Sequence, residues 1–149
     1  MTRRRHSRGD RGSMALTTAV FWPAALVVFG LLIACGRIVL AQGAADAAAR
    51  DAARTASLAA DPATADTDAR QAAQTSLTSS GIHCSTIAVT IDTSGLAAPV
   101  GQAAAVTVTV SCTAPLAELL VPGATGSKTL TSTKTSPVDT FAARHREQP

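Results

Sequence analysis

The sequence predicts an α+β protein: an N-terminal transmembrane helix that continues into a long extracytoplasmic helix, then a second helix and a small antiparallel β-sheet. Three observations predict this class. Residues 14–36 are 23 residues without a charge, residues 37–60 are rich in alanine and lack proline, and apolar residues alternate with a period of two from residue 86. A chain of 149 residues has room for one small domain beside the helices.

These patterns divide the chain where its charge, composition or periodicity changes. We expect a basic cytoplasmic tail over 1–13, the transmembrane helix over 14–36, an extracytoplasmic helical region over 37–80, a small β-domain over 81–136 and a flexible tail over 137–149.

The uncharged run 14–36 is long enough to cross a membrane. A bilayer core of about 30 Å needs about 20 apolar residues at a rise of about 1.5 Å per residue. Five arginines and one aspartate lie in residues 1–13, whereas only Arg37 flanks the other end of the run. The positive-inside rule therefore places the N-terminus in the cytoplasm and the C-terminal domain outside the cell membrane, with the lipid bilayer as a partner.

The excess of basic residues comes from this N-terminal tail. Residues 37–149 hold eight Lys/Arg against nine Asp/Glu, and Phe141 is the one aromatic residue among them. A nucleic-acid-binding surface needs a basic face, usually with aromatic side chains that stack on bases. We therefore expect no nucleic acid as a partner.

Four positions along the first helix are candidates for packing against other membrane helices: Thr17, Pro23, Gly30 and Gly36. Pro23 removes a backbone hydrogen bond and is expected to kink the helix, which membrane helices tolerate when neighbours satisfy the backbone. Gly30 and Gly36 have no side chain, so a second helix can approach closely there.

Two other interpretations of the uncharged run fit the sequence less well. A cleaved signal peptide has an apolar core of about 7–15 residues and a small-residue cleavage site, whereas this run is longer and lacks an A-x-A end. A lipoprotein signal would use Leu-Ile-Ala-Cys at 32–35 and would leave a lipidated Cys35. Residues 37–40 continue as a helix instead of a flexible tether, so Cys35 is expected to be a small apolar residue at a helix end.

Residues 37–60 are expected to extend the membrane helix as one rod, because alanine is the best helix former. Asp46 with Arg50, and Asp51 with Arg54, have the spacing of weak helix-stabilising ion pairs.

A second helix is predicted from Pro62 to Ser79. Asp61 is suited to the N-cap position, and Pro62 to the first helical position. Gly81 is expected to end the helix, because glycine readily adopts the left-handed conformation found just after a helix C-terminus.

Two strands come next, over 86–92 and 106–112, each with β-branched residues on one face. They predict an antiparallel hairpin with a long loop. Residues 115–121 suggest a short helical turn, and residues 127–135 a third, weaker strand.

The two cysteines at the ends of these strands are predicted to form a disulfide. A hairpin that pairs Asp92 with Ala104 places Cys84 opposite Cys112, although the apolar alternation prefers a register shifted by one residue. An oxidising compartment favours the bond, which would contribute about 3 kcal/mol by closing a loop of about 27 residues. A metal site that includes His83 is the alternative, and two cysteines without CxxC spacing are a weak signal for it.

The sequence contains no catalytic motif that supports an enzyme. Gly-rich phosphate loops, GxSxG and HExxH motifs are absent, and His6 and His145 lie in the tails. Asp66 and Asp68 are expected to lie on a solvated helix face. We therefore expect no enzymatic activity, no cofactor, no bound metal and no small-molecule substrate.

The order of features over residues 11–58 resembles the TadE-like proteins, minor pilin-like components of tight-adherence (Flp) pilus systems that are common in actinobacteria. Residues 11–13, Arg-Gly-Ser, look like the start of that family's segment, and Ala19 and Pro23 fall where its alanine and proline stand. Gly36 and Arg37 look like its closing pair, and the Ala/Arg-rich residues 44–54 are similar to the segment after the family's helix.

The resemblance implies a non-enzymatic pilin-like component of a pilus-assembly or secretion system, whose partners are other membrane proteins of that system. It also implies cleavage by a prepilin-type peptidase between Gly12 and Ser13. A glutamate commonly stands at the fifth position of the mature chain in the family, and here that position is Thr17. Thr17 cannot form the charge pair that a buried glutamate would need. The alternative is a membrane- or lipid-anchored extracellular binding or structural module unrelated to pili.

Overall fold

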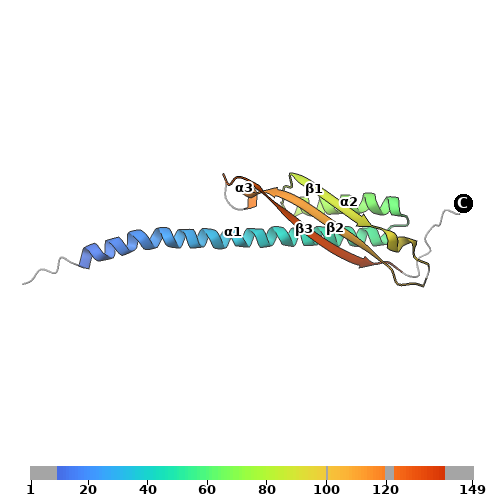
Figure 1. Ribbon diagram of the computed structural model, residues 1–149, viewed down its shortest axis with the longest axis horizontal. Coiled ribbons are helices and arrows are strands. Elements are labelled where there is room, and N and C mark those ends of the chain that lie inside the picture. The colour runs from blue at the N-terminus through green and yellow to red at the C-terminus, as the bar shows by residue number, and fades with distance from the viewer. Residues whose placement is uncertain (1–9, 100, 120–122, 140–149) are drawn as a thin grey trace, which may run out of the picture.

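The computed structural model describes residues 10–99, 101–119 and 123–139, with side chains from Thr18 onward except that of residue 118. The fold is α+β, as predicted: a long N-terminal helix, a second helix and a three-stranded antiparallel sheet (Figure 1). The second helix and the sheet gather along the C-terminal half of the long helix, and the N-terminal half extends away from them (Figure 1).

Helix α1 runs from Asp10 to Leu58 as one element of 49 residues. Pro23 lies inside it, and the helix continues through this position. The predicted rod therefore forms, and it ends two residues earlier than the predicted limit at residue 60.

Helix α2, Pro62–Ser79, begins and ends where the sequence predicts. The carboxylate of Asp61 accepts a hydrogen bond from the Thr64 amide at 2.9 Å, which satisfies one of the free N–H groups at the helix start. Gly81 has φ +71°, in the left-handed region that lets the chain leave the helix. The two helices form an antiparallel hairpin joined by a short connection.

The sheet has the order β1-β2-β3, with β1 at Thr86–Asp92, β2 at Ala105–Pro115 and β3 at Ser127–Pro137. A short helix, α3, at Leu116–Leu119 lies in the β2–β3 connection. Strand β3 is longer than predicted, because all its residues pair with β2. The ordered domain also extends beyond the predicted boundary at residue 136, since Val138 is buried and its amide donates to the Ala104 carbonyl at 2.9 Å.

The predicted hairpin register is wrong by three residues. Asp92 pairs with Thr107 instead of Ala104, because a 3-10 helix, η1, at Ser94–Ala97 occupies part of the connection. The observed register places Val89 opposite Val110. The apolar residues of both strands thereby share one face, as their alternation requires.

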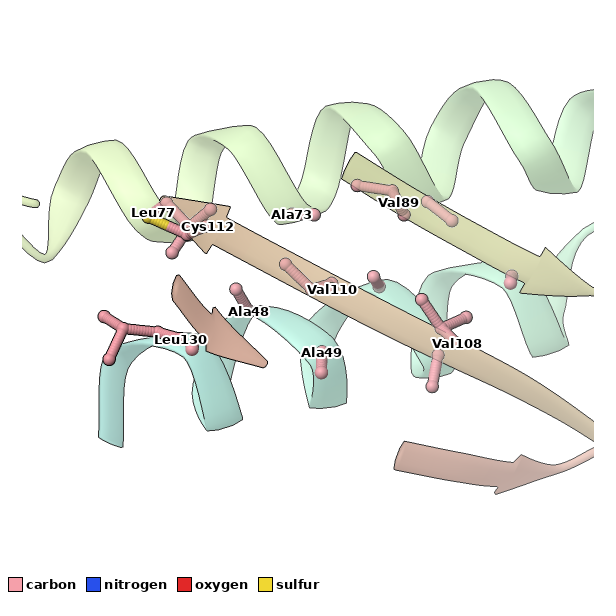
Figure 2. Close-up of a cluster of buried hydrophobic side chains, with 14 of the residues drawn as sticks. Ala48, Ala49, Ala73, Leu77, Val89, Val108, Val110, Cys112 and Leu130 are labelled. Carbon is pink, nitrogen blue, oxygen red and sulfur yellow. The ribbon is translucent and has the colours of Figure 1, made fainter. Parts of the chain in front are cut away.

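The core lies between the inner face of the sheet and the two helices (Figure 2). Alanine supplies nearly all of the helical part, and Leu77 is the one large residue that α2 buries. The small side chains let the backbones of two helices approach closely. The helical alanines with at most 3% exposure are Ala41, Ala45, Ala48, Ala49, Ala52, Ala53, Ala56, Ala65, Ala69 and Ala73. We call this set the alanine seam.

Replacement of Gly95 by alanine should destabilise the domain by about 1–3 kcal/mol, because an added Cβ would lie 2.1 Å from the Ala105 backbone oxygen. Gly43→Ala is the matched control: a Cβ at this helical position has nothing within 4 Å, so the change should stabilise by about 0.5–1 kcal/mol. Urea unfolding of the full chain in detergent measures both. Equal midpoints for the two variants would contradict the close approach of η1 to β2.

Candidate interaction surfaces

The N-terminal half of α1 presents an exposed apolar surface. Side chains from Val20 to Leu40 are mostly 57–75% exposed, including Phe21, Trp22 and Phe29. Within the described residues, α1 is the one helix long and apolar enough to span a membrane. An apolar surface of this extent is unfavourable in water, so it calls for lipid or for other apolar helices.

One side of this surface is hollowed next to Pro23. A shallow apolar pocket of about 330 Å³ is lined by Phe21, Ala24, Ala25, Val28 and Phe29. Gly30 and Gly36, two of the predicted packing positions, are open, since a Cβ at either would meet nothing within 4 Å. Gly12, Ser13 and Thr17 belong to α1. The structure describes only the backbone at these positions.

A polar contact region joins α1 to β3, and we call it the polar seam. Its members on α1 are Gln42, Asp46 and Ser57, and its members on β3 are Thr131, Ser132, Lys134 and Ser136. The Gln42 amide donates to the Thr131 carbonyl at 3.0 Å, and the Ser57 and Ser136 hydroxyls lie 3.0 Å apart. The Ser132 hydroxyl donates to the Asp46 carboxylate, and the Lys134 ammonium lies 3.6 Å from the same carboxylate.

The polar seam explains why β3 is ordered although its sequence is polar. Ser57 and Ser132 are only 7% and 5% exposed, so their hydroxyls need partners inside the protein. Ser136 is the partner of Ser57, and Asp46 is the partner of Ser132. Asp46 thus holds β3 instead of serving only the helix-surface pair with Arg50 that the sequence suggests.

The carboxyl of Asp46 gives the domain a pH-dependent contact. The hydrogen bond from Ser132 and the charge of Lys134 hold the pKa of Asp46 below its ordinary value. A carboxyl with a lowered pKa in the folded state binds fewer protons than in the unfolded state. Its stabilising effect is therefore present above the ordinary Asp pKa of about 3.9 and is lost as the pH falls toward the folded pKa.

We expect Asp46→Asn to lower the melting temperature at pH 7. The difference in melting temperature between this variant and wild type should become smaller as the pH falls below about 4. Ser132→Ala removes the main cause of the shift and should weaken the same pH dependence. Thermal unfolding by circular dichroism at a series of pH values measures this. If the difference in melting temperature between wild type and Asp46→Asn is the same at every pH, the Asp46 carboxyl does not contribute to the pH dependence of stability.

The outer face of the sheet is a hydroxyl-rich array. Its positions on the three strands are Thr86, Ala88, Thr90, Asp92, Thr107, Thr109, Ser111, Thr113, Thr129, Thr131, Thr133 and Thr135. Four pairs of hydroxyls face one another across β2 and β3, with oxygens 2.8–3.2 Å apart. The sequence identifies these residues only as the polar positions of alternating strands. It does not predict the hydroxyl pairs, because the alternation does not specify which residues of β2 and β3 lie opposite one another.

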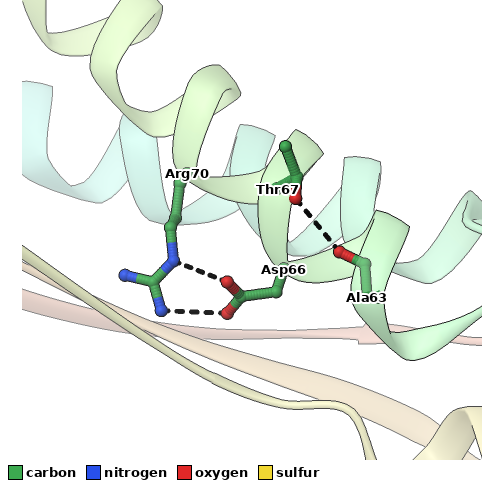
Figure 3. Close-up of polar contacts among 4 residues, drawn as sticks. All are labelled: Ala63, Asp66, Thr67 and Arg70. Carbon is green, nitrogen blue, oxygen red and sulfur yellow. Dashed lines mark hydrogen bonds and ion pairs between the residues drawn. The ribbon is translucent and has the colours of Figure 1, made fainter.

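The exposed side of the helical hairpin carries a polar groove of about 510 Å³, lined by Asp51, Asp68, Gln71 and several hydroxyl side chains. The Ser76 hydroxyl donates to Asp51 at 2.9 Å across the two helices. Elsewhere on α2, Arg70 donates two hydrogen bonds to Asp66, at 2.7 and 2.9 Å (Figure 3). This pair lowers the pKa of Asp66 and raises that of Arg70, but both side chains are about half exposed, so solvent weakens its effect on stability.

Cys84 and Cys112 form the predicted disulfide, with their Cα atoms 5.4 Å apart. The bond forms although the register differs from the predicted one, because Cys84 precedes β1, outside the strand pairing, and packs against the core in which Cys112 is buried. Both thiols are used, so Cys84 cannot ligate a metal together with His83. Among the described residues, no three His, Cys, Asp or Glu side chains are grouped to hold a metal ion, and Cys35 is an exposed free thiol.

No protein-family model, curated protein or solved structure matches the chain.

Proposed function

We propose that the chain is a non-enzymatic, membrane-anchored, pilin-like component of a tight-adherence pilus-assembly or secretion system. The observation that carries the proposal is that one continuous helix serves two purposes: its N-terminal half is apolar and exposed, and its C-terminal half is the core of the domain. The partners are the lipid bilayer and other membrane proteins of the system, which contact the N-terminal half.

The C-terminal half of α1 makes this helix a rigid connection. The alanine seam packs it against α2, and the polar seam fastens it to β3. A helix held on two sides cannot bend freely where it leaves the domain. A push or rotation of the membrane segment is therefore transmitted to the outer domain, which suits a component of an assembly that moves subunits out of the membrane.

The N-terminal half supplies the surface for neighbouring helices. The hollow at Ala24 and Ala25 lies between Phe21 and Phe29, so a neighbouring helix could place an aliphatic side chain between the two rings. Gly30 and Gly36 continue this open surface toward the domain. The uncharged Thr17 requires that packing in any such assembly rest on shape and not on a buried charge pair.

The charge of the N-terminal tail favours one orientation. The arginines of residues 1–13 favour the cytoplasmic side, and the disulfide of the domain is compatible with an oxidising compartment on the opposite side. The resemblance to TadE-like proteins over residues 11–58 supports the same arrangement.

The N-terminal mass and sequence of the protein from native membranes test the proposal. A mature chain that starts at Ser13 is expected, and Gly12→Leu should abolish that cleavage while a control Gly9→Leu should leave it intact. A start at Met1 or Thr2 would contradict processing and favour the second candidate, an anchored extracellular binding or structural module. A lipidated Cys35 as the first residue would contradict the membrane-spanning helix altogether.

One observation favours the second candidate, an anchored extracellular binding or structural module. The hydroxyl-rich outer face of the sheet is a regular surface that no other part of the described chain covers. A soluble partner captured by the outer domain in cells that lack all pilus genes would support it over the pilus component.

A further inference from the structure

A pocket of about 310 Å³ opens where α1 leaves the domain. Leu40, Ile82 and Leu119 contribute apolar walls, and Arg37, Ser80 and Gly81 contribute polar groups. The pocket thus joins three separate parts of the chain: α1, the end of α2 and α3. Helix α3 lies at the end of the domain nearest the N-terminal half of α1 (Figure 1), and the pocket that Leu119 of α3 lines therefore lies at that end.

The position of Arg37 places this pocket at the membrane surface. Arg37 is the first charged residue after the uncharged run 14–36. A run of this length fills the hydrocarbon core, so the next residue stands at the level of the lipid headgroups. Leu40 lies about one helical turn beyond Arg37 on the domain side, so the pocket opens to the headgroups and its apolar walls lie outward of the acyl chains.

The pocket has two electrostatic ends. The guanidinium of Arg37 has five N–H donors, so it can bind a phosphate while it keeps another contact. Ser80 is the C-cap of α2, and the C-terminus of a helix carries a partial negative charge that favours a cation. A ligand that carries both a phosphate and an ammonium group is complementary in charge to these two groups.

We propose that this pocket binds the headgroup of a phospholipid with a primary ammonium, of the phosphatidylethanolamine class. The phosphate contacts Arg37, the ammonium lies at the C-terminus of α2 beside Ser80, and the two-carbon linker between them lies against Leu40. The bound lipid fixes the height and tilt of the domain above the bilayer. This inference rests on the proposed membrane placement.

Lipid retention by the full-length protein tests the proposal. The protein is reconstituted in vesicles of equal parts phosphatidylethanolamine, phosphatidylglycerol and phosphatidylcholine and is then extracted in mild detergent. Native mass spectrometry measures the mass of the protein together with any lipid that stays bound. Wild type is expected to retain one ethanolamine lipid. Arg37→Gln should reduce this retention by about tenfold or more, the effect of losing a charge-assisted hydrogen bond.

Two further variants separate the pocket from charge in general. Ser80→Phe fills the opening but keeps Arg37, and it should lose the lipid as well. Arg50→Gln removes an exposed arginine farther along α1 and should retain it. Formation of the Cys84–Cys112 disulfide and an unchanged melting temperature show that Ser80→Phe is folded.

Added solutes identify the group that is bound. O-phosphoethanolamine should displace the lipid from wild type, and inorganic phosphate at the same concentration should displace less. Equal displacement by the two solutes would mean a site for phosphate alone and would overturn the assignment of the ammonium group.

Three other results would also overturn the proposal: equal retention of all three lipids, retention unchanged by Ser80→Phe, or a lowered melting temperature of Arg37→Gln without loss of lipid. The last would mean that Arg37 stabilises the fold and does not bind the lipid. Resistance of the protein to alkaline extraction from membranes is measured first. If extraction releases it, the proposed function fails; if it stays, a negative lipid result concerns the pocket alone.

Discussion

Removal of the disulfide by the double replacement Cys84→Ala and Cys112→Ala should lower the free energy of unfolding by about 3–4 kcal/mol. The bond links residues 28 apart in sequence, and breaking it restores conformational freedom to that loop in the unfolded chain. Cys112 is also fully buried in β2, so the loss of its sulfur leaves a small void in the core.

This effect is large for a domain whose helical core is mostly alanine, because small domains are stable by only about 5–15 kcal/mol. Urea unfolding of the full chain in detergent measures it, with Cys35→Ala as the control. Cys35 is exposed and free, so its replacement should change the unfolding free energy by less than about 0.5 kcal/mol. Equal urea midpoints for the double variant and wild type would show that the disulfide does not stabilise the domain against unfolding.

Enlargement of the alanine seam should have the second large effect. Ala48 in α1 and Ala73 in α2 are both 0% exposed, and Figure 2 shows them among the buried side chains between helices and sheet. A leucine at either position adds three carbon atoms where the helices leave no room. Each change should cost about 1–3 kcal/mol, and the two together more than either alone.

The matched control is Ala63→Leu, at an exposed position in the first turn of α2. This change should alter the unfolding free energy by less than about 0.5 kcal/mol. Urea or thermal unfolding followed by circular dichroism distinguishes the cases. If Ala48→Leu and Ala63→Leu unfold alike, the helices do not pack as closely as the alanine seam requires.

Helix α2 and its limits could be predicted because the signals for them are local. Asp61, Pro62 and Gly81 act on the backbone of their immediate neighbours, and each performs the predicted role at the ends of α2. The alternation of β-branched residues likewise defines which side of β1 and β2 is buried. The disulfide pair could be predicted from the same two strands, since the loop between them had to bring Cys84 and Cys112 together.

The register and the extent of β3 could not be predicted from local signals. The register depends on η1, which takes up part of the connection and lies against Ala105, so that Asp92 pairs with Thr107, three residues farther along than predicted. The inner face of β3 is mostly polar, so its pattern alone gives no reason for burial. Asp46 and Ser57, more than 70 residues away in sequence, supply the partners that make it favourable.

By itself, the sequence determined the class of the protein, the apolar helix, the limits of α2, the two main strands and the disulfide. Only the tertiary structure decided the strand register, the length of β3, the polar seam and the pocket at Arg37. The physical reason is distance along the chain. A cap, a turn or an alternating strand depends on residues a few positions apart, whereas a polar contact or a pocket depends on which distant side chains the packed helices and sheet bring together.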